Sequence, residues 1–325
     1  MKIFYKFFFK ILSLVITFLG ITVVSFWVIH LAPGSPTDLQ TTLNPKASTE
    51  VRERLNKIYG LDKPLSVQYI NWLKRIIHFD FGYSLSGDHR PVWDKIKERL
   101  PLTLALNLIS MFFIFILAIP LGILSAVYAD SWFDKLTTIF VFIGFSVPGF
   151  WLALLLMLWL GIYCPIFPIS GLTSLNFSEL SFWGKLWDLA NHLALPVMVF
   201  TFTGLAGLSR YMRSSMLEVL GQDFILLARA KGLPYKIVIL KHALKNALLP
   251  VITILGLSVP GLIGGSVIIE SIFALPGLGQ LFYQAVMARD YPIILGNLVL
   301  GAILTLVGNL LADLGYFLAD PRIRK

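Results

Sequence analysis

Long apolar runs alternate with short polar segments along most of this chain of 325 residues. Six of these runs reach or approach the roughly 20 apolar residues that a helix needs to cross the hydrocarbon core of a bilayer. The fourth run is short, and we expect its helix to continue into the polar residues that follow. The pattern therefore predicts an all-α polytopic membrane protein with six transmembrane helices, at Ile11–Leu31, Leu102–Tyr128, Leu136–Tyr163, Leu193–Leu208, Ala247–Ile269 and Pro292–Leu318.

Prolines and the length of the first run refine this prediction. Pro120, Pro148 and Pro260 lie inside predicted spans, where neighbouring helices can satisfy the carbonyl groups that a proline leaves free. We therefore expect kinks at these positions. The first run is longer than the about 7–15 apolar residues of a signal-peptide core. The "APGSP" that follows contains no small-x-small cleavage site free of proline, so we expect an uncleaved first span.

Lysine and arginine positions predict the orientation in the membrane. Only 14% of the residues are charged, against about 25% in soluble domains. If the N-terminus is cytosolic, the short cytosolic segments hold fourteen lysines and arginines, and the two short external loops hold one each, Lys185 and Arg289. This asymmetry follows the positive-inside rule and predicts that both termini are cytosolic. The net charge of +9 thus reflects topology, and no basic face indicates nucleic-acid binding.

This topology divides the chain into three parts. Residues 1–31 form the cytosolic N-terminus and first span, residues 32–101 an external loop, and residues 102–325 a core of five spans with a cytosolic loop at 209–246. The external loop is too long for a mere connector. Its patterns predict small helices at "TEVRERLNKIYG", with Thr49 as a cap and Gly60 as a stop, and at "LSVQYINWLKRIIHF". The loop is either a packed cap on the bundle or a docking platform for a soluble external partner.

The cytosolic loop carries clear signals for a short helix. The Asp223 carboxylate can accept hydrogen bonds from free amides of a first turn, and the helix is predicted over Phe224–Lys231. Gly232 suits the left-handed residue that ends a helix. Pro234 suits the first position of the next helix, "PYKIVILKHALKNALLP".

Four bulky apolar residues, Phe224 to Leu227, stand in a row at the start of this short helix. Because successive helical residues lie about 100° apart, their side chains encircle it. Full burial of each is worth about 1.5–3 kcal/mol, and a helix that is apolar all round belongs in a buried position. The charges of Asp223 and Arg229 keep it out of the hydrocarbon. It packs either against its own bundle or into a groove of a cytosolic partner.

The sequence contains no pattern that indicates catalysis or a metal site. There is no HExxH or GxSxG motif, the five histidines are scattered, and the single cysteine, Cys164, excludes an internal disulfide. A phosphate-binding loop of the form GxxxxGK[ST] is also missing from the sequence. We therefore predict that the chain is not an enzyme and binds no cofactor, and that any ATP hydrolysis takes place in a separate subunit.

Polar and small residues within the spans leave two interpretations open. Asp313 is the one clear ionisable residue in a span, with Asn309 four residues earlier on the same face. We expect Asp313 to pair with Arg210 or Arg213 near the cytosolic boundary; the alternative is a proton-coupled secondary transporter that uses Asp313. Gly261 and Gly265 form a GxxxG pattern, which allows close helix packing within the subunit or across a subunit interface.

One segment resembles the cytoplasmic coupling loop of ABC-importer permeases of the dipeptide/oligopeptide/nickel family. It reads "RSSMLEVLGQDFILLARAKGLPYKIVILKHALKNALLPVIT". The likeness extends along nearly the whole chain. It continues in "APGSP", "YGLDKPLSVQYINWL", "FDFGYSL", "PLGILSA", "SVPGFWLALLL", "ESIFALPGLGQL", "ARDYP" and "DPRIR". The general importer motif has a glutamate six residues before its glycine, and Leu226 stands at that position here. In the branch of the family that this chain resembles, the sequence "ARAKG" stands in place of the general importer motif.

The resemblance implies a "B"-type permease subunit in the bacterial inner membrane that forms the translocation path for peptides; nickel and other small solutes remain open as substrates. Its implied partners are a second permease subunit, as a heterodimer, together with two cytosolic ATPase subunits that carry ATP and Mg²⁺, an external substrate-binding protein and membrane lipid. The apolar turn would then seat in a groove of an ATPase subunit. The residues predicted to couple to the ATPase are Asp223, Phe224, Leu226, Leu227, Ala228, Arg229, Ala230, Lys231 and Gly232.

Overall fold

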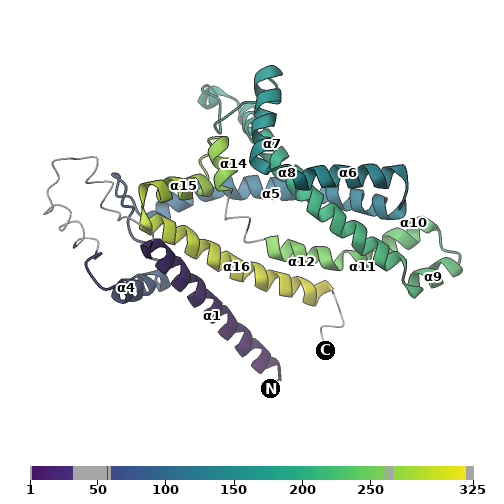
Figure 1. Ribbon diagram of the computed structural model, residues 1–325, viewed down its shortest axis with the longest axis horizontal. Helices are drawn as coiled ribbons and strands as arrows, with labels where there is room; N and C mark the ends of the chain where they lie inside the picture. Colours follow the sequence, from purple (N-terminus) through teal and green to yellow (C-terminus); the bar gives the residue numbers. More distant parts are fainter. Residues whose placement is uncertain (1, 32–56, 58–59, 259–260, 262–265, 320–325) are drawn as a thin grey trace. The chain divides into compact units, whose positions relative to one another are not determined.

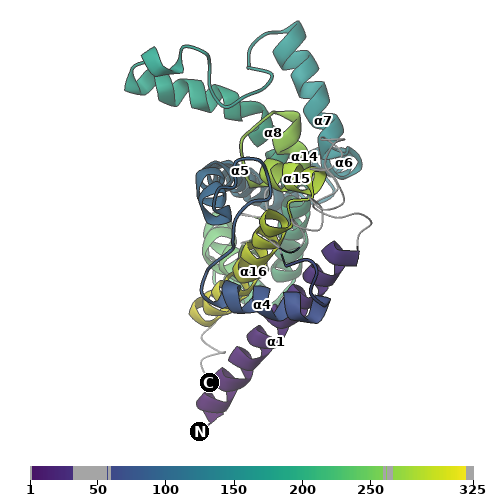
Figure 2. The ribbon, with the colours of Figure 1, turned by 90° about the vertical axis from the view of Figure 1, so that its left-hand side faces the viewer.

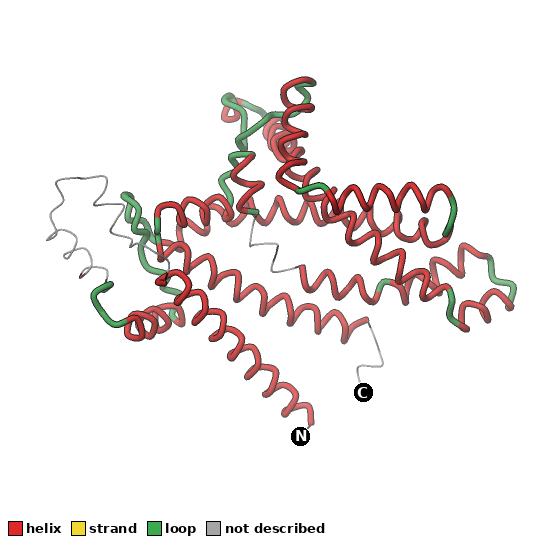
Figure 3. The backbone as a smooth tube through the Cα atoms, viewed as in Figure 1, coloured by secondary structure: helices red, strands yellow, loops and turns green. Residues whose placement is uncertain are grey.

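The computed structural model describes residues 2–31, 57, 60–258, 261 and 266–319. Regular structure in this part of the chain is helical, apart from a single antiparallel bridge between Tyr83 and Pro91 (Figure 3). The prediction of an all-α fold is confirmed. The described helices are α1 Lys2–Leu31, α4 Leu65–Ile77, α5 Val92–Val127, α6 Trp132–Ser146, α7 Gly149–Leu156, η1 Met157–Tyr163, η2 Phe177–Glu179, α8 Phe182–Leu220, α9 Asp223–Ala230, α10 Tyr235–Ile237, η3 Val238–Ala243, α11 Leu244–Ala247, α12 Leu249–Ser258, α14 Val267–Ile272, α15 Leu278–Ala288 and α16 Tyr291–Ala319.

The described residues contain five helical stretches, or up to six, that are long and apolar enough to cross a membrane. The sixth depends on counting a bent pair, Trp132–Ser146 with Gly149–Tyr163, as one span. The other five stretches lie at Phe9–Leu31, Val92–Val127, Phe182–Leu220, Tyr235–Gly256 and Tyr291–Leu311. The fourth of these begins twelve residues before the predicted span Ala247–Ile269, part of which lies outside the described residues.

The bent pair has a sharp break at a proline. The two halves meet at 99°, and α7 turns away from the direction of α6 (Figure 2). Val147 is extended, with φ −85° and ψ 117°, because a following proline disfavours the helical conformation. The kink predicted at Pro148 is thus confirmed, as a complete break. By contrast, α5 continues unbroken through Pro120, and Pro260 lies outside the described residues.

The fourth predicted span is the core of a much longer helix. α8 has 39 residues, from Phe182 to Leu220, and includes Pro196. Its continuation beyond Leu208 confirms the expectation that this span runs on into polar residues. It also means that residues 209–220, the first part of the predicted cytosolic loop, form the last turns of α8. The segment that reverses the chain is therefore confined to α9 and its flanking residues.

The chain folds as two compact units, each with its own core. One comprises Met1–Pro101 with Gly277–Leu306, and the other Leu102–Pro276 with Val307–Lys325. The long helices α5 and α16 each contribute to both units.

Aromatic packing joins α1 and α4 in the first unit. The ring of Phe26 is nearly buried and stacks on His30 at a centroid distance of 3.9 Å, and it also faces Tyr69 and Trp72. The hydroxyls of Thr22 and Tyr69 lie 3.1 Å apart. The helix α4 confirms the one predicted at "LSVQYINWLKRIIHF".

Two glycines of the first unit, Gly60 and Gly296, have different structural roles. Gly60 has φ +67°, the left-handed conformation expected of it, whereas most of the helix predicted before it, with Thr49, lies outside the described residues. A Cβ added to Gly296 of α16 would lie 3.0 Å from the side chain of Val92 and 3.3 Å from that of Phe81. The missing side chain thus lets α16 approach the beginning of α5.

Small residues bring α5, α6 and α8 together in the second unit. Ala118 and Ala126 of α5 are buried, and a Cβ added to Gly122 between them would lie only 2.7 Å from the Ser209 carbonyl oxygen. On α6, a Cβ added to Gly144 would lie 2.9 Å from that of Ala206. Such small-xxx-small spacing allows helices in membranes to approach closely. α8 therefore packs tightly against both neighbours.

Candidate functional site

The short helix α9 follows the end of α8, where the chain turns toward α10 (Figure 1). The N-cap residue is Gln222, with extended φ −81° and ψ 149°, and Asp223 is the first helical residue. The prediction that Asp223 caps the helix is thus wrong by one position, because the chain enters the helix one residue earlier. Its carboxylate nevertheless lies at the helix N-terminus, where the macrodipole favours negative charge.

The end of α9 matches the predicted glycine corner. Gly232 has φ +73°, and its N–H donates to the Arg229 carbonyl at 2.9 Å. A Cβ added to Gly232 meets nothing within 4 Å, so the requirement for glycine comes from backbone conformation rather than from crowding. Pro234 is the N-cap of α10 and not its first residue, one position from the prediction.

The apolar turn of α9 is divided between a buried face and an exposed face. Ile225 is fully buried and Ala228 is 6% exposed, and both belong to a hydrophobic core that includes Val238 and Ile239 of η3. This packing anchors α9 to the segment that follows it. Self-packing therefore explains one face of the helix.

The opposite face carries apolar side chains that lie at the surface. Leu226 is 56% and Leu227 is 57% exposed, and Ala230 is exposed beside them. At about 100° per residue, these three positions point away from Ile225. They are named the α9 surface below. Phe224, which is 42% exposed, lies at its edge.

Basic residues border the α9 surface. The guanidinium of Arg229 lies 5.1 Å from the centre of the Tyr235 ring, a cation–π contact that holds the side chain across the glycine corner. Lys231 is the exposed C-cap residue. The two cations lie at the C-terminal end of the helix, where the macrodipole favours positive charge. The result is an apolar patch with a basic edge.

The base of α9 is continuous with the helices of the second unit. The core that holds Ile225 also includes Met212 and Met216 of α8 and Ala118 of α5. In addition, the Ser215 hydroxyl of α8 donates to the Ala247 carbonyl of α11 at 2.9 Å. Ile225 of α9 and the two methionines of α8 therefore belong to one packed core.

An ion pair between α6 and α8 was not predicted from the sequence. Arg213 donates from Nε and Nη2 to the two carboxylate oxygens of Asp134, each at 2.7 Å, and Asp134 is only 4% exposed. Arg213 thus has a carboxylate partner other than the Asp313 that we expected. Asp313 is exposed and Asn309 half-buried on α16. Arg210 has no carboxylate within 4 Å among the described residues, so the expected pairing of Asp313 with Arg210 or Arg213 is not present there.

The glycine pair predicted to mediate packing is only partly described. A Cβ added to Gly261 meets nothing within 4 Å, and Gly265 lies outside the described residues. The close helix contacts of the second unit occur at Gly122 and Gly144 instead. The signal for the first of these was the spacing of Ala118, Gly122 and Ala126 in the sequence.

Sequence reasoning also missed a buried carboxylate in the first unit. Asp290 is 1% exposed, and its Oδ2 accepts hydrogen bonds from the Ser84 hydroxyl and from the N–H groups of Leu85 and Ser86, the latter two at 3.0 and 3.2 Å. Its Oδ1 accepts from the Ile293 N–H at 3.4 Å. We name this arrangement the Asp290 junction. It joins "FDFGYSL" to "ARDYP", two motifs about 200 residues apart in the sequence.

A lysine completes the polar environment of this junction. Lys95 donates to the hydroxyls of Ser84 and Ser86 at 3.0 and 2.7 Å and lies 2.8 Å from the Asp88 carboxylate. The hydrogen bond from Lys95 lowers the pKa of Asp88 to about 2. Asp88 therefore stays charged at ordinary pH and keeps Lys95 in place.

In the described part of the chain, no group of three or more His, Cys, Asp or Glu side chains could hold a metal ion. The α9 surface exposes Leu226 and Leu227, with Arg229 and Lys231 at its edge.

The chain is similar to known membrane components of transport systems. Residues 118–325 match the family model described as "Binding-protein-dependent transport system inner membrane component", and residues 4–107 match the corresponding N-terminal model. The chain is 45% identical to the oligopeptide transport system permease protein AppB of Bacillus subtilis, over 94% of each chain. It is 37% identical to the dipeptide transport system permease protein DppB of Escherichia coli K12, over 98% of each chain.

A solved structure shares the fold. A chain of the MetNI methionine ABC transporter, in an inward-facing conformation, aligns with a TM-score of 0.53 and 20% identity, over 69% of this chain and 96% of its own length. At this level of identity the likeness concerns the fold alone.

Proposed function

The chain belongs to the inner membrane components of binding-protein-dependent transport systems, and on that premise we propose that α9 is the helix through which it couples to an ATPase subunit. Membership makes the chain a non-catalytic permease subunit of an ABC importer, a multi-pass inner membrane protein that works with ATPase and binding-protein partners.

The exposed apolar face of α9 is the observation that carries this proposal. Leu226 and Leu227 are more than half exposed while Ile225 beneath them is fully buried. Burial of an exposed leucine is worth about 1.5–3 kcal/mol, so a partner with an apolar groove gains affinity there. The basic edge made by Arg229 and Lys231 favours a groove with acidic residues at its rim.

Topology supports a cytosolic position for α9. With both termini inside the cell, the Lys/Arg asymmetry of the short loops puts residues 209–246 on the cytosolic side, where ATP is available. The external segment 32–101 then faces the binding protein. We further propose that the pore contains this chain and a second, related permease subunit, with one ATPase subunit beneath each and membrane lipid around them.

Peptides are the proposed substrates. Two relatives that match over nearly their whole length are permeases for oligopeptides and dipeptides by name. Nickel and other small solutes remain as alternatives. A proton-coupled mechanism through Asp313 is not favoured, because members of this family work with ATPases. Uptake that stops on ATP depletion and continues with a proton uncoupler is the expected result.

The α9 surface is tested by a charge placed in it. Leu226→Asp should reduce uptake at least about tenfold, because an unpaired charge buried in a dry contact costs several kcal/mol. The ATPase subunits should be lost from the variant on gentle purification, or remain with hydrolysis uncoupled from uptake. The measurements are co-purification and peptide uptake in cells with equal amounts of permease in the membrane.

A second leucine of the same loop provides the matched control. Leu240 in η3 is 51% exposed, close to Leu226, but it lies outside α9. Leu240 lies in the apolar stretch Tyr235–Gly256, so Leu240→Asp is compared at equal amounts of permease in the membrane, where it should retain its ATPase subunits. Normal uptake and full ATPase retention in Leu226→Asp would contradict the assignment of α9 as the coupling helix.

A further inference from the structure

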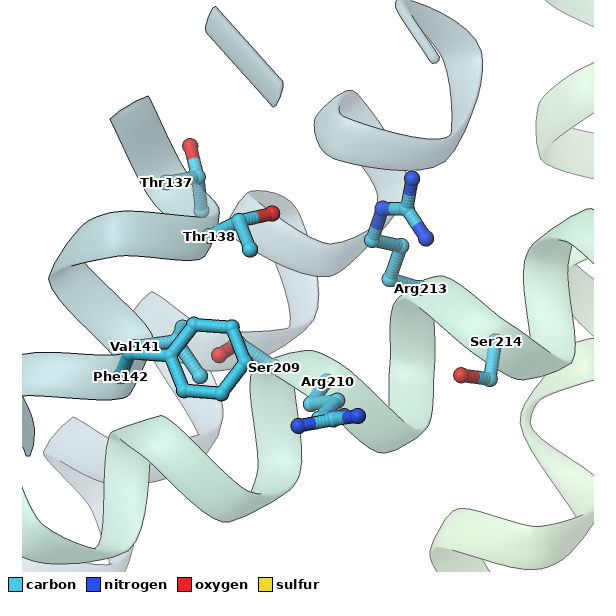
Figure 4. Close-up of a pocket in the computed structure, with 8 residues that line it drawn as sticks. All are labelled: Thr137, Thr138, Val141, Phe142, Ser209, Arg210, Arg213 and Ser214. Atoms are coloured by element: carbon cyan, nitrogen blue, oxygen red, sulfur yellow. The ribbon is translucent and has the colours of Figure 1, made fainter. Parts of the chain in front are cut away.

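A small polar pocket opens between α6 and α8. Its volume is about 170 Å³, and both helices contribute residues at the same spacing, i, i+1, i+4 and i+5, beginning at Thr137 on α6 and at Ser209 on α8. Figure 4 shows these two sets of side chains facing each other. The pocket lies in the second unit and is separate from the α9 surface.

The pocket contains one cation whose charge is not neutralised by a carboxylate. Arg213 is bound by both oxygens of Asp134, which also accepts from the Asp130 N–H at 3.0 Å. Arg210, in contrast, has no carboxylate within 4 Å among the residues that the structure describes. Its guanidinium lies 5.5 Å from the centre of the Phe142 ring. The ring contact positions the charge and leaves the guanidinium donors available to a ligand.

Two hydroxyl groups in the pocket lining add further donors near its two arginines. Thr138 and Ser214 line the pocket, and in the described part of the chain neither hydroxyl has a hydrogen-bond partner. In Figure 4 the Thr138 hydroxyl points toward Arg213, and that of Ser214 points toward Arg210. A guanidinium with nearby hydroxyls matches the oxygens of a phosphate group.

The surroundings of the pocket have the properties of a membrane boundary. Trp132 is 79% and Tyr211 is 63% exposed, as is typical of aromatic residues at the level of lipid headgroups. Lys135 lies over the Trp132 ring at 5.8 Å. Next to the pocket, α6 exposes an apolar face at Leu136 and Ile139, which are 60% and 56% exposed. This face suits acyl chains.

We propose that this pocket binds the phosphate of an anionic phospholipid headgroup, with the acyl chains along the exposed face of α6. Basic pockets between membrane helices on the cytosolic side suit such headgroups. The assignment to the cytosolic leaflet rests on the orientation proposed above. A bound lipid would bridge α6 and α8 beside the Asp134–Arg213 ion pair and so hold the two helices together at the level where α8 leaves the membrane.

Lipid retention by the purified transporter tests this proposal. The complex is extracted in mild detergent, incubated with phosphatidylglycerol or phosphatidylcholine, and examined by native mass spectrometry. Wild-type protein should retain phosphatidylglycerol preferentially. Arg210→Ala should weaken this retention about fivefold, the effect of one basic group near an anionic surface. Thr138→Val, which conserves shape, should weaken it to a smaller extent.

Lys135→Ala is the matched control, because it removes a cation at the same boundary without altering the pocket lining. Its retention of phosphatidylglycerol should equal that of wild type. Equal losses in Lys135→Ala and Arg210→Ala would overturn the proposal in favour of general surface charge. Binding of inorganic phosphate at Arg210 without retention of phosphatidylglycerol would overturn it in favour of a soluble anion.

This experiment is independent of the coupling proposal. Lipid retention is measured on detergent-solubilised protein and needs neither uptake nor ATP hydrolysis. External labelling of a cysteine placed at Ser214, in a Cys164→Ser background, would reject the proposed orientation and hence the cytosolic leaflet. Loss of the α9 contact, by contrast, would leave the lipid result unchanged.

Discussion

The α9 surface and the Asp290 junction each depend on a short turn of the chain, and they are stabilised in different ways. α9 is defined by neighbours in sequence, with Ile225 buried beneath two exposed leucines and Gly232 at its end. The Asp290 junction joins two segments that are about 200 residues apart, through hydrogen bonds to one buried carboxylate. The first presents apolar groups to a partner, whereas the second satisfies polar groups internally.

This difference indicates what each region contributes. Buried donors that lose their acceptor cost about 1–3 kcal/mol each, so the Asp290 junction is a structural element whose loss should unfold its unit. Substitutions in the α9 surface should change the free energy of unfolding of the isolated subunit only slightly, because its side chains are already exposed. Substitutions should therefore affect stability at the junction and coupling at α9.

The largest effect is expected from Asp290→Ala. It removes the acceptor for the Ser84 hydroxyl and for the N–H groups of Leu85 and Ser86, with a loss of about 3–5 kcal/mol. Thermal melting of the purified permease, followed by fluorescence-detected gel filtration, measures the change. The control is Asp62→Ala, at an exposed aspartate of the same unit. Equal melting temperatures for the two variants would contradict a stabilising role of the junction.

An intermediate effect is expected from Gly122→Ala, which tests close packing in the second unit. The new Cβ would lie 2.6 Å from the Met212 Cβ, 2.7 Å from the Ser209 carbonyl oxygen and 3.0 Å from the Arg213 nitrogen. Because two of these atoms belong to the backbone, α5 and α8 must separate, at a cost of about 1–3 kcal/mol. The measurement is again the melting temperature.

Gly301→Ala is the control for this packing, since its Cβ meets nothing within 4 Å in the middle of α16. It should leave stability unchanged or raise it by up to about 1 kcal/mol, because alanine favours helix more than glycine does. A Gly122→Ala variant as stable as Gly301→Ala would show that α5 and α8 do not need this approach.

The smallest effect on stability, but a marked effect on coupling, is expected from Gly232→Val. Its φ of +73° costs an L-residue about 1–2 kcal/mol, and a β-branched side chain is tolerated least. The strain should alter the end of α9 and reduce ATP-driven uptake while the permease still inserts. Gly232→Asn, which accepts this conformation more readily, should retain more uptake. If valine and asparagine behave alike, the corner does not control coupling.

The sequence predicted features that depend on near neighbours. The short helix, its stop at Gly232 and the break at Pro148 were all found, because caps, glycine and proline act on adjacent backbone. The boundaries shifted by one residue at Asp223 and Pro234, where the choice between the cap and the first turn depends on how α8 ends. The angle of 99° could not be predicted, since proline removes a hydrogen bond without setting a direction.

Features that depend on distant segments were not predictable in the same way. The burial of Ile225, but not of Leu226, depends on where η3 packs, and a run of four apolar residues carries no sign of that choice. Asp290 precedes Tyr291 and a proline, a pattern that reads as an ordinary helix cap. From the sequence Arg213 was expected to pair with Asp313, and only the packing of α6 against α8 selects Asp134 instead.

The length of α8 gives it the properties of a lever. Its 39 residues correspond to about 58 Å at 1.5 Å per residue, nearly twice the thickness of the hydrocarbon core. If such a rod tilts about a point near one end, a rotation of about 10° moves the other end by about 10 Å. The Gly122 and Gly144 contacts with α5 and α6 meet α8 at Ala206, Ser209 and Met212 and provide such a point toward its α9 end. If α9 couples to an ATPase subunit as proposed, a small displacement of α9 would thereby become a larger movement at the far end of α8.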